Sequence, residues 1–447
     1  MVCYILLDNK IKKIVAIGIG VSLLLFVIGI LIGYYSGKAA GSSSSSSSSA
    51  SVEGGSGSVA AALTSSCLLE EIKGDQKTRL FIDRYVERHN VKHVCISEAY
   101  QCQDFNMPNH YIAHHLNKKA IVIDGRMDEE AWEEVPWSES FVDIRSSSYP
   151  KPKFSTKFKM RWDDERLYIG AYIEDTDLWG TIQGQETGIW QDNMIDILMD
   201  VDGSMFNYKQ IEINVLGTTL DHILYKSPYD SIGPNPNWTD NDLSWHPDMK
   251  KAVYTDGTVN TPGDKDKFWS VELSMTFEQL ANRSERVQAS PQDNEVWFMQ
   301  VGRAHHPLEV ENGTYQKVPN VSFDEMGWWA WQPCDAVNFL LQDRWGLVQF
   351  KRSTIDNTFN FQKWHLYRAL FDMMDGMNKY KAIHGRFVTM IEELDIPPYL
   401  MSGVCVEIPE IKVIDRGVYS GFEITVRSKF LSHKPAHINE ERYVWFT

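Results

Sequence analysis

The segment Ile189–Thr218 reads IWQDNMIDILMD, then VDGSMF, then NYKQIEINVLGT. Apolar and polar residues alternate in its first and third parts, which is the pattern of two β-strands that each have one apolar face. The apolar set comprises Ile195, Ile197, Met199, Ile211, Ile213 and Val215. The middle part contains Asp202-Gly203, a pair typical of turns. The segment therefore predicts a β-hairpin with one face in a hydrophobic core.

The other face of this hairpin carries polar side chains beside a tryptophan. Asp196 lies on the first strand, Glu212 and Asn214 lie on the second, and Trp190 precedes both. The CH groups of a sugar ring pack on an aromatic face, and its hydroxyls need donors and acceptors in fixed places. The pattern therefore indicates a carbohydrate site. A solvated sheet face with a tryptophan at its edge is the structural alternative.

Short strand-like segments separated by turn residues recur through the chain. They lie at 157–162, 167–174, 211–215, 222–225, 252–255, 268–275, 296–303 and 346–350. Many short strands with few long helical patterns predict a mainly β protein, and we expect an antiparallel β-sandwich.

The pattern changes after residue 353. Trp364, Tyr367, Phe371 and Met374 fall at three- and four-residue spacing, which predicts a helix with one apolar face. A second short helix is expected over 386–394, and the remainder alternates like a small sheet. Residues 353–447 are therefore expected to form an α+β appendage.

The N-terminal part predicts a membrane anchor. Residues 14–35 form an uncharged apolar run that is long enough to be a transmembrane helix, although a cleaved signal peptide is an alternative. Lysines before the run place residues 1–13 in the cytoplasm as a short tail. Residues 36–66 are rich in Ser and Gly, as in a flexible linker. Residues 67–115 would be a stalk or a packing segment.

Charge, cysteines and sequons narrow the class of protein. The formal net charge of -16 argues against nucleic acid as a partner, because phosphate binding needs clustered cations. Five cysteines follow the apolar run, and Cys95 with Cys102 is the expected local disulfide. Sequons typical of a glycoprotein ectodomain occur at Asn237, Asn282, Asn312 and Asn320.

Five segments in order resemble the carbohydrate-binding module family 9-like domains, which are related to the DOMON-type sandwiches. They lie within 116–352 and read IDGRMDEEAWEEVPW, MRWDDERLYIGAYIEDTD, IWQDNMIDILMDVDG, NYKQIEINVLGTTLD and RWGLVQF. The resemblance implies a β-sandwich that holds a glucan or xylan chain end between two tryptophans. It implies Trp190 as the first tryptophan and Trp331, in WWAWQP, as the second. The polar side chains that it implies are Asp196, Asn214 and Arg303.

Two features of the family pattern bear on the ligand and on a cofactor. Glu212 stands where the family has an arginine, which replaces five hydrogen-bond donors by acceptors, so hydroxyl recognition must differ. Family members also carry structural calcium. Asp200 and Asp202 would supply oxygen ligands for it, with an ordinary Asp-Gly turn as the alternative.

These observations together predict a membrane-tethered carbohydrate-binding protein. It would be a single-pass membrane protein whose C-terminal part is extracellular or lumenal. A glycoside hydrolase of carbohydrate catabolism, with Asp196 and Glu212 as its paired carboxylates, is one alternative. A haem-binding DOMON-type electron-transfer domain and a protein-adhesion ectodomain are the others. A non-catalytic binding module is favoured, because the sequence shows no separate catalytic domain.

Overall fold

The computed structural model describes residues 76–89, 107–184, 188–227, 241–353, 355–401 and most of 403–447. All of these residues belong to the second of two compact units, Met1–Ser66 and Cys67–Thr447. The expected cytoplasmic tail, transmembrane helix and linker lie outside the described residues, as do Cys95, Cys102 and Asn237. In the described ranges, no helix combines the length and the apolar composition that a membrane crossing requires.

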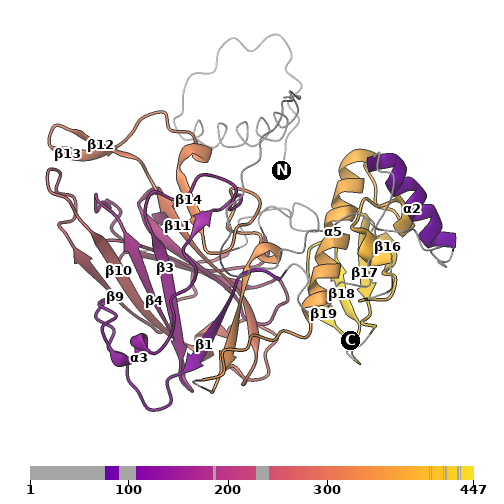
Figure 1. Ribbon diagram of the computed structural model, residues 1–447, viewed down its shortest axis with the longest axis horizontal. Helices are drawn as coiled ribbons and strands as arrows, with labels where there is room; N and C mark the ends of the chain where they lie inside the picture. The colour runs from indigo at the N-terminus through magenta and orange to yellow at the C-terminus, as the bar shows by residue number, and fades with distance from the viewer. Residues whose placement is uncertain are drawn as a thin grey trace, which may run out of the picture. The chain divides into compact units, whose positions relative to one another are not determined.

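The described part of the chain is mainly β, as predicted (Figure 1). Its helices are α2 (Gln76–His89), α3 (Glu130–Glu133), α4 (Phe277–Leu280) and α5 (Trp364–His384), with 3-10 turns η1 (Ile189–Gln191), η2 (Phe323–Glu325), η3 (Gln342–Arg344), η4 (Ile391–Glu393) and η5 (Pro398–Met401). The strands of the large sheet are β1 (His110–His115), β2 (Val142–Asp143), β3 (Thr156–Trp162), β4 (Arg166–Glu174), β5 (Met194–Asp200), β6 (Tyr208–Asn214), β7 (Thr219–Leu224), β8 (Asn241–Asp242), β9 (Met249–Asp256), β10 (Phe268–Thr276), β11 (Val296–His305), β14 (Gly327–Ala330) and β15 (Gly346–Lys351). The remaining strands are β12 (Leu308–Glu311), β13 (Thr314–Lys317), β16 (Glu410–Asp415), β17 (Ser420–Val426), β18 (Ala436–Asn439) and β19 (Val444–Phe446).

The large sheet is mixed, so the expectation of a purely antiparallel arrangement is wrong. Its main path runs β8-β7-β6-β5-β11-β15-β1-β3-β4-β10-β9. Strand β1 pairs in parallel with both β15 and β3. Parallel neighbours need long connections, and β1 meets this condition because its partners lie far from it in the chain. Every other printed pairing along the path is antiparallel.

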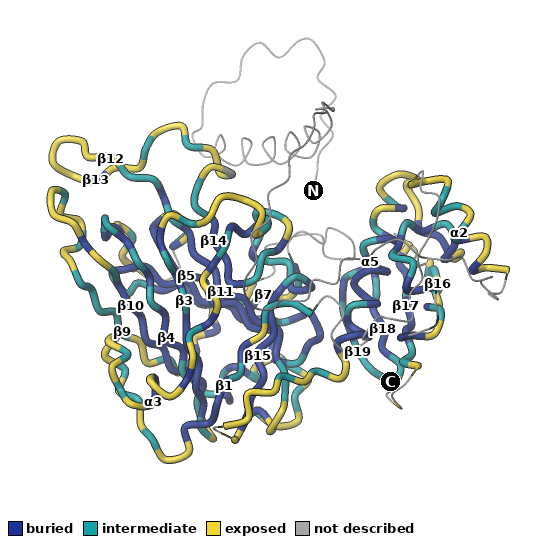
Figure 2. Tube along the Cα trace, viewed as in Figure 1, coloured by how far each residue is buried: buried dark blue, intermediate teal, exposed yellow. Residues whose placement is uncertain are grey.

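The sheet curls so that its two halves enclose one core. Ile195 and Ile197 of β5 share a buried cluster with Phe158 of β3, Ile169 of β4 and Val271 of β10. Strand β5 lies in one half of the main path and β3, β4 and β10 lie in the other, with at least three strands between, so their side chains meet because the sheet folds over on itself. Most strand residues are buried, and exposed residues gather in connections and in the β12–β13 hairpin (Figure 2).

The predicted hairpin of Ile189–Thr218 is confirmed as β5 and β6. The two strands pair antiparallel, with Asp196 opposite Glu212 and Ile195 opposite Ile213. The inner face joins the core just described, and we call the opposite face of β5, β6 and β7 the outer face. Every residue of β5 and β6 is buried. The solvated sheet face that was the structural alternative is therefore absent here.

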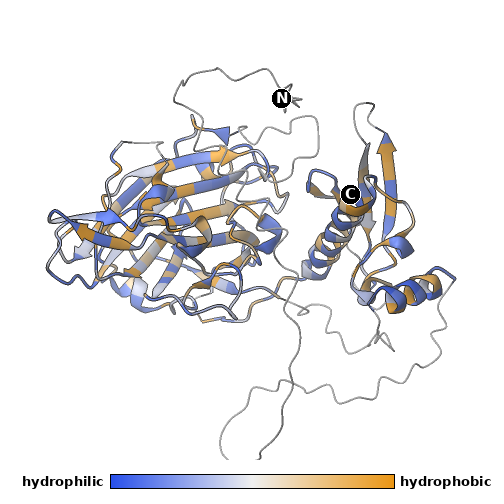
Figure 3. Cartoon of the chain, turned by 90° about the horizontal axis from the view of Figure 1, so that it is seen from above, coloured by the Kyte–Doolittle hydropathy of each residue, from blue (hydrophilic) through white to orange (hydrophobic). Residues whose placement is uncertain are grey.

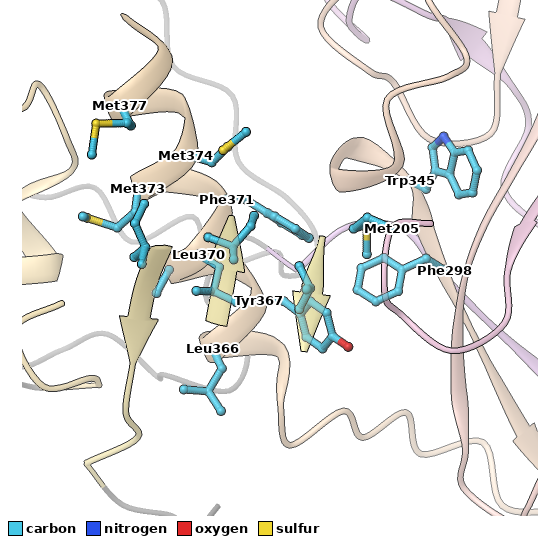
Figure 4. Packing of buried hydrophobic residues seen from close by; sticks show 14 of the residues in the cluster. Met205, Phe298, Trp345, Leu366, Tyr367, Leu370, Phe371, Met373, Met374 and Met377 are labelled. Carbon is cyan, nitrogen blue, oxygen red and sulfur yellow. The ribbon is translucent and has the colours of Figure 1, made fainter. Parts of the chain in front are cut away.

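A second buried cluster covers part of the outer face. Leu198 of β5, Tyr208 of β6 and Phe298 of β11 belong to it together with residues of α5. The Tyr367 ring of α5 packs on Phe298, with ring centroids 4.9 Å apart, and Figure 4 shows the two side chains facing each other. Tyr367 and Phe371 of α5 therefore cover the outer face of the sheet at Phe298.

Helix α5 also packs on a four-stranded antiparallel sheet, β16-β17-β18-β19. This is the α+β arrangement expected for the C-terminal residues, and the hydropathy of the strands alternates along their length (Figure 3). The second helix expected over 386–394 is wrong, since only the 3-10 turn η4 forms there. Phe387, Val388 and Ile391 are buried in the second cluster, so tertiary packing overrides the weak helical spacing.

Candidate functional site

The hairpin brings Asp196 and Glu212 together on the outer face. They stand directly opposite each other across β5 and β6. Gln210, two residues before Glu212, donates from Nε2 to Asp196 Oδ2 at 2.9 Å and to Glu212 Oε1 at 3.3 Å. His222 of β7 lies opposite Gln210, with its Nε2 2.9 Å from Gln210 Oε1. A polar strip therefore crosses three neighbouring strands, and we call Asp196, Gln210, Glu212 and His222 the outer-face strip.

Both carboxyl groups of the strip are buried, Asp196 to 1% exposure and Glu212 to 5%. Burial raises the pKa of Glu212 to about 7. Burial, together with the neighbouring Glu212 carboxylate, raises the pKa of Asp196 well above its usual value. Two like charges this close in a low dielectric cannot both form readily, so the pair retains a proton near neutral pH. Asp196 Oδ1 accepts no hydrogen bond from the described residues.

Trp190 stands beside this pair with its side chain 40% exposed. It lies in η1, just before β5, and its position is set by its main chain. Its backbone N–H donates to Glu212 Oε2 at 3.0 Å. Its carbonyl oxygen lies 3.0 Å from His306 Nε2. The structure thus holds the backbone of Trp190, a residue that is 40% exposed, against one of the two buried carboxyl groups.

Asn214 lies on the same face, but its side chain stabilises the turn after β6. Its Nδ2 donates to the Ile182 carbonyl at 3.0 Å and to Asp192 Oδ2 at 2.9 Å. Its Oδ1 accepts the backbone N–H groups of Leu216 and Thr218. Its amide is fully occupied in closing the turn after β6, as a strand-end cap would be.

Arg303 is not brought together with the strip. Its register partner on β5 is Ile195, and Ile195 points into the inner core, so Arg303 lies on the opposite face of the sheet from Asp196. Its guanidinium is 1% exposed and reaches across to the facing half of the sheet. It donates to Asp175 Oδ2 at 2.7 Å and to the Glu174 carbonyl at 2.8 Å. Arg303 thus joins the two halves from inside and cannot contact a ligand on the outer face.

Trp331 is also an inner residue, and the expectation that it provides the second sugar-binding face does not fit its position. It is 0% exposed, its Nε1 donates to Glu139 Oε2 at 2.9 Å, and its ring stands edge-on to Phe158. The side chain of Trp328 on β14 lies on the other face of the sheet from that of Trp331. Trp328 pairs with Ala304, which pairs with Met194 on the outer face of β5. The outer-face tryptophan of this strand is therefore Trp328, which is 6% exposed.

Phe339 covers the sheet next to the strip. Gly302 of β11 stands directly opposite Asp196, and a Cβ added to it would lie 2.4 Å from Phe339 Cε1. The ring of Phe339 packs edge-on to Trp328, with centroids 5.8 Å apart. The outer face is therefore filled between Asp196 and Trp328, and an indole pair cannot enclose a ligand there without movement of Phe339.

Asp200 and Asp202 shape the turn between β5 and β6. Asp200 accepts the backbone N–H groups of Asp202 and Gly203 on Oδ1 and that of Met205 on Oδ2. Asp202 accepts N–H groups from Ser204 and Glu285. These oxygens already accept backbone N–H groups, and the nearby Asp202 carboxyl group helps burial to raise the pKa of Asp200, so calcium binding at this turn stays a prediction. The described ranges also contain no group of three or more His, Cys, Asp or Glu arranged to hold a metal.

Sequence reasoning missed Gln210, His222 and His306 as parts of the site. Gln210 and His222 could have been found, because period-two alternation puts Gln210 on the face of Glu212, and the next strand brings His222 opposite it. No local signal points to His306. It reaches Trp190 only through the fold.

A family model matches a part of the chain that contains three of the four residues of the strip. Residues 123–216 match the family model described as "Carbohydrate family 9 binding domain-like", and this range contains Trp190, Asp196, Gln210 and Glu212. No curated protein gives a significant match. A putative carbohydrate-binding protein from Bacteroides uniformis is 11% identical over 55% of this chain and 100% of its own, with a TM-score of 0.39. A family 9 carbohydrate-binding module from Caldicellulosiruptor kristjanssonii in complex with cellotriose is 13% identical over 57% of this chain and 99% of its own, with a TM-score of 0.31. The cytochrome domain of cellobiose dehydrogenase from Myriococcum thermophilum is 10% identical over 48% of this chain and 91% of its own, with a TM-score of 0.21.

Proposed function

We propose that this chain binds a carbohydrate on the outer face of β5 and β6. One observation carries the proposal. Trp190, a residue that is 40% exposed, is hydrogen-bonded through its backbone to Glu212 of a buried carboxyl pair in which Asp196 Oδ1 has no hydrogen-bond partner among the described residues. The sugar ring would pack on Trp190, and a hydroxyl would supply the donor that Asp196 lacks. The family match over 123–216 supports this proposal because it covers all of these residues.

The positions of the two carboxyl groups favour binding over hydrolysis. A glycoside hydrolase places its carboxyl groups about 5 to 9.5 Å apart on either side of the bond that it cleaves. Asp196 and Glu212 are instead neighbours on one sheet face, joined through a single amide of Gln210. A substrate cannot pass between them, so they are suited to hold one side of a ligand.

Isothermal calorimetry with cellotriose and xylotriose tests the proposal. We expect Trp190→Ala to weaken binding about tenfold, because an aromatic contact is worth about 1 kcal/mol beyond the apolar area that it buries. The matched control is Tyr149→Ala, since Tyr149 is a similarly exposed aromatic residue, at 44%, in a separate loop. Absence of binding to any glucan or xylan fragment, or equal losses in both variants, would contradict the proposal.

We further propose that residues 14–35 tether the chain to a membrane, with the folded part extracellular or lumenal. The support is the apolar run and the lysines before it. Asn282, Asn312 and Asn320 are exposed, as acceptors of N-glycans must be, and Asn312 lies between β12 and β13. A mobility shift after enzymatic removal of N-glycans, lost in the Asn→Gln variants, would support this topology. A chain found in the soluble fraction without glycans would contradict it.

A further inference from the structure

A cavity of about 710 Å³ lies at one end of the large sheet, beside the start of α5. Three segments supply most of its lining, namely residues 201–202 after β5, 294–296 at the start of β11 and 360–363 before α5. Protein sites for small molecules commonly have volumes of this order. The cavity is separate from the site proposed above, because Trp190 precedes β5, residues 201–202 follow it, and the seven residues of β5 span about 20 Å.

Two largely buried side chains hold the walls of this cavity in place. Gln349 of β15 is 0% exposed, and its Nε2 donates to the carbonyl oxygens of Asn294 at 3.1 Å and Asn360 at 2.8 Å. Its Oε1 accepts the backbone N–H of Asn360 at 3.0 Å. Arg286 donates from Nη1 to the carbonyl oxygen of Val201 at 2.9 Å. The cavity is therefore formed before a ligand enters, so binding need not order its walls.

The formal charges that line the cavity sum to zero. Asp202 and Glu295 are negative, and Arg286 and Lys363 are positive. Arg286 forms an ion pair with Glu295, and Lys363 Nζ lies 4.4 Å from the centre of the Phe446 ring. Asp202 accepts two backbone N–H groups. An ionic ligand would therefore meet no excess of opposite charge, which favours an uncharged ligand.

Neutral polar groups of the lining have unused hydrogen-bonding capacity. Tyr367 is 4% exposed, yet its hydroxyl makes no hydrogen bond with the described residues and its oxygen is not sealed from solvent. This oxygen lies against the turn after β5, where a Cβ added to Gly203 would meet it, and Figure 4 shows it directed away from the methionines of α5. The side-chain amides of Asn360 and Gln362 also have no hydrogen-bond partner among the described residues. The half-buried ring of Phe361 adds an apolar surface.

We propose that this cavity is a second carbohydrate site, which takes one end of a neutral sugar chain. The Tyr367 hydroxyl and the amides of Asn360 and Gln362 would bond to the sugar hydroxyls, since all of these groups both donate and accept. The CH groups of the ring would pack on Phe361. This inference goes beyond the proposed function and does not depend on Trp190. Two sites on one chain would raise its affinity for a polysaccharide surface through multivalent binding.

The test titrates the full chain with cellotriose and with xylotriose by calorimetry. The wild type should bind two molecules of the preferred trimer per chain, and Trp190→Ala should weaken only one of these binding events. In the Trp190→Ala background, Tyr367→Phe should weaken the other event about fivefold, because it removes one hydrogen bond and keeps the ring that packs on Phe298. Gln362→Ala, a change at an exposed side chain, should weaken the same event.

The matched control is Gln316→Ala, which makes the same change at an exposed glutamine on β13 and should leave both events unchanged. One bound trimer per chain in the wild type, or equal affinities with and without the Tyr367 hydroxyl, would overturn the inference and leave the proposed function intact. Binding that responds to Tyr367→Phe and Gln362→Ala but not to Trp190→Ala would support the inference and contradict the proposed function. Absence of binding to both trimers would overturn both.

Discussion

Gly302→Ala is expected to destabilise the fold, because Phe339 occupies the space in front of Gly302. A Cβ at this position would lie 2.4 Å from Phe339 Cε1, 2.6 Å from Cζ and 2.8 Å from Cδ1. Real Cβ atoms do not approach carbon atoms so closely, so the ring must move. Phe339 is buried and packs on Trp328, which limits that movement. The contact makes glycine the residue that this strand position requires.

The size of the effect follows from two opposing contributions. Overpacking a buried site costs about 1–3 kcal/mol. Replacing glycine by alanine within a strand gains about 0.5–1 kcal/mol, because alanine loses less backbone freedom on folding. The net expectation for Gly302→Ala is therefore a loss of up to about 2.5 kcal/mol in the free energy of unfolding.

A double-mutant cycle isolates the clash. Urea unfolding is measured for the wild type, Gly302→Ala, Phe339→Leu and the double variant. Phe339→Leu loses stability by itself through lost packing, but it removes the ring atoms that the new Cβ would meet. In that background Gly302→Ala should be neutral or stabilising. An equal cost in both backgrounds, or no cost in the wild type, would refute the assignment of Phe339 as the obstacle.

Two further predictions concern the buried carboxyl groups. Burial raises the pKa of Glu212 from 4.5 to about 7, so between these values the native chain holds a proton that the unfolded chain has lost, and stability should fall as pH rises through this window. The lowered pKa values of the buried His222 and His306 make stability rise with pH, so the effect of Glu212 must be isolated by comparing the wild type with Glu212→Gln. The difference in melting temperature between the two should change sign or shrink from about pH 5 to about pH 8. A difference independent of pH would show that Glu212 is ionised when buried. Asp200→Ala should lower the free energy of unfolding by about 2–3 kcal/mol, because three backbone N–H groups lose their acceptor. A calcium chelator should leave the melting temperature of the wild type unchanged. A large fall in melting temperature with the chelator would instead support a calcium ion at this turn.

Local pattern predicted the strands well because a half-buried strand carries its face assignment in its own sequence. Ile195, Ile197 and Ile211 alternate with polar residues, and each lies in the inner core. The pattern could not show that the outer face is buried too. That burial comes from Phe339 and from α5, whose Tyr367 packs on Phe298, and contacts between residues this far apart leave no local periodicity. The parallel pairing of β1 was missed for the same reason.

Site residues beyond the hairpin could not be assigned to a face without the strand register. The sequence does not show which face of the strand that carries Arg303 would contact the ligand. Only the pairing of Arg303 with Ile195 shows that Arg303 points inward. For WWAWQP the sequence held a usable signal. Trp329 and Trp331 must share one face and Trp328 the other, so the choice was between two faces rather than among three residues. Trp329 pairs with Arg303, which fixes the inner face for both.

The covering of the outer face limits the length of ligand that the proposed site can hold. A groove for a polysaccharide along the sheet would have to continue from Trp190 past Asp196 onto β11. That path meets Phe339 at Gly302, directly beside Asp196, and beyond it Trp328 is 6% exposed. Trp190 is 40% exposed beside the strip, whereas on the side of β11 and β14 the exposed ring of Phe323 packs on Trp328. A ligand that packs on Trp190 can place one sugar unit against the carboxyl pair, with further units extending away from β11. Chain ends and short oligosaccharides therefore suit this geometry, and internal segments of a long chain do not.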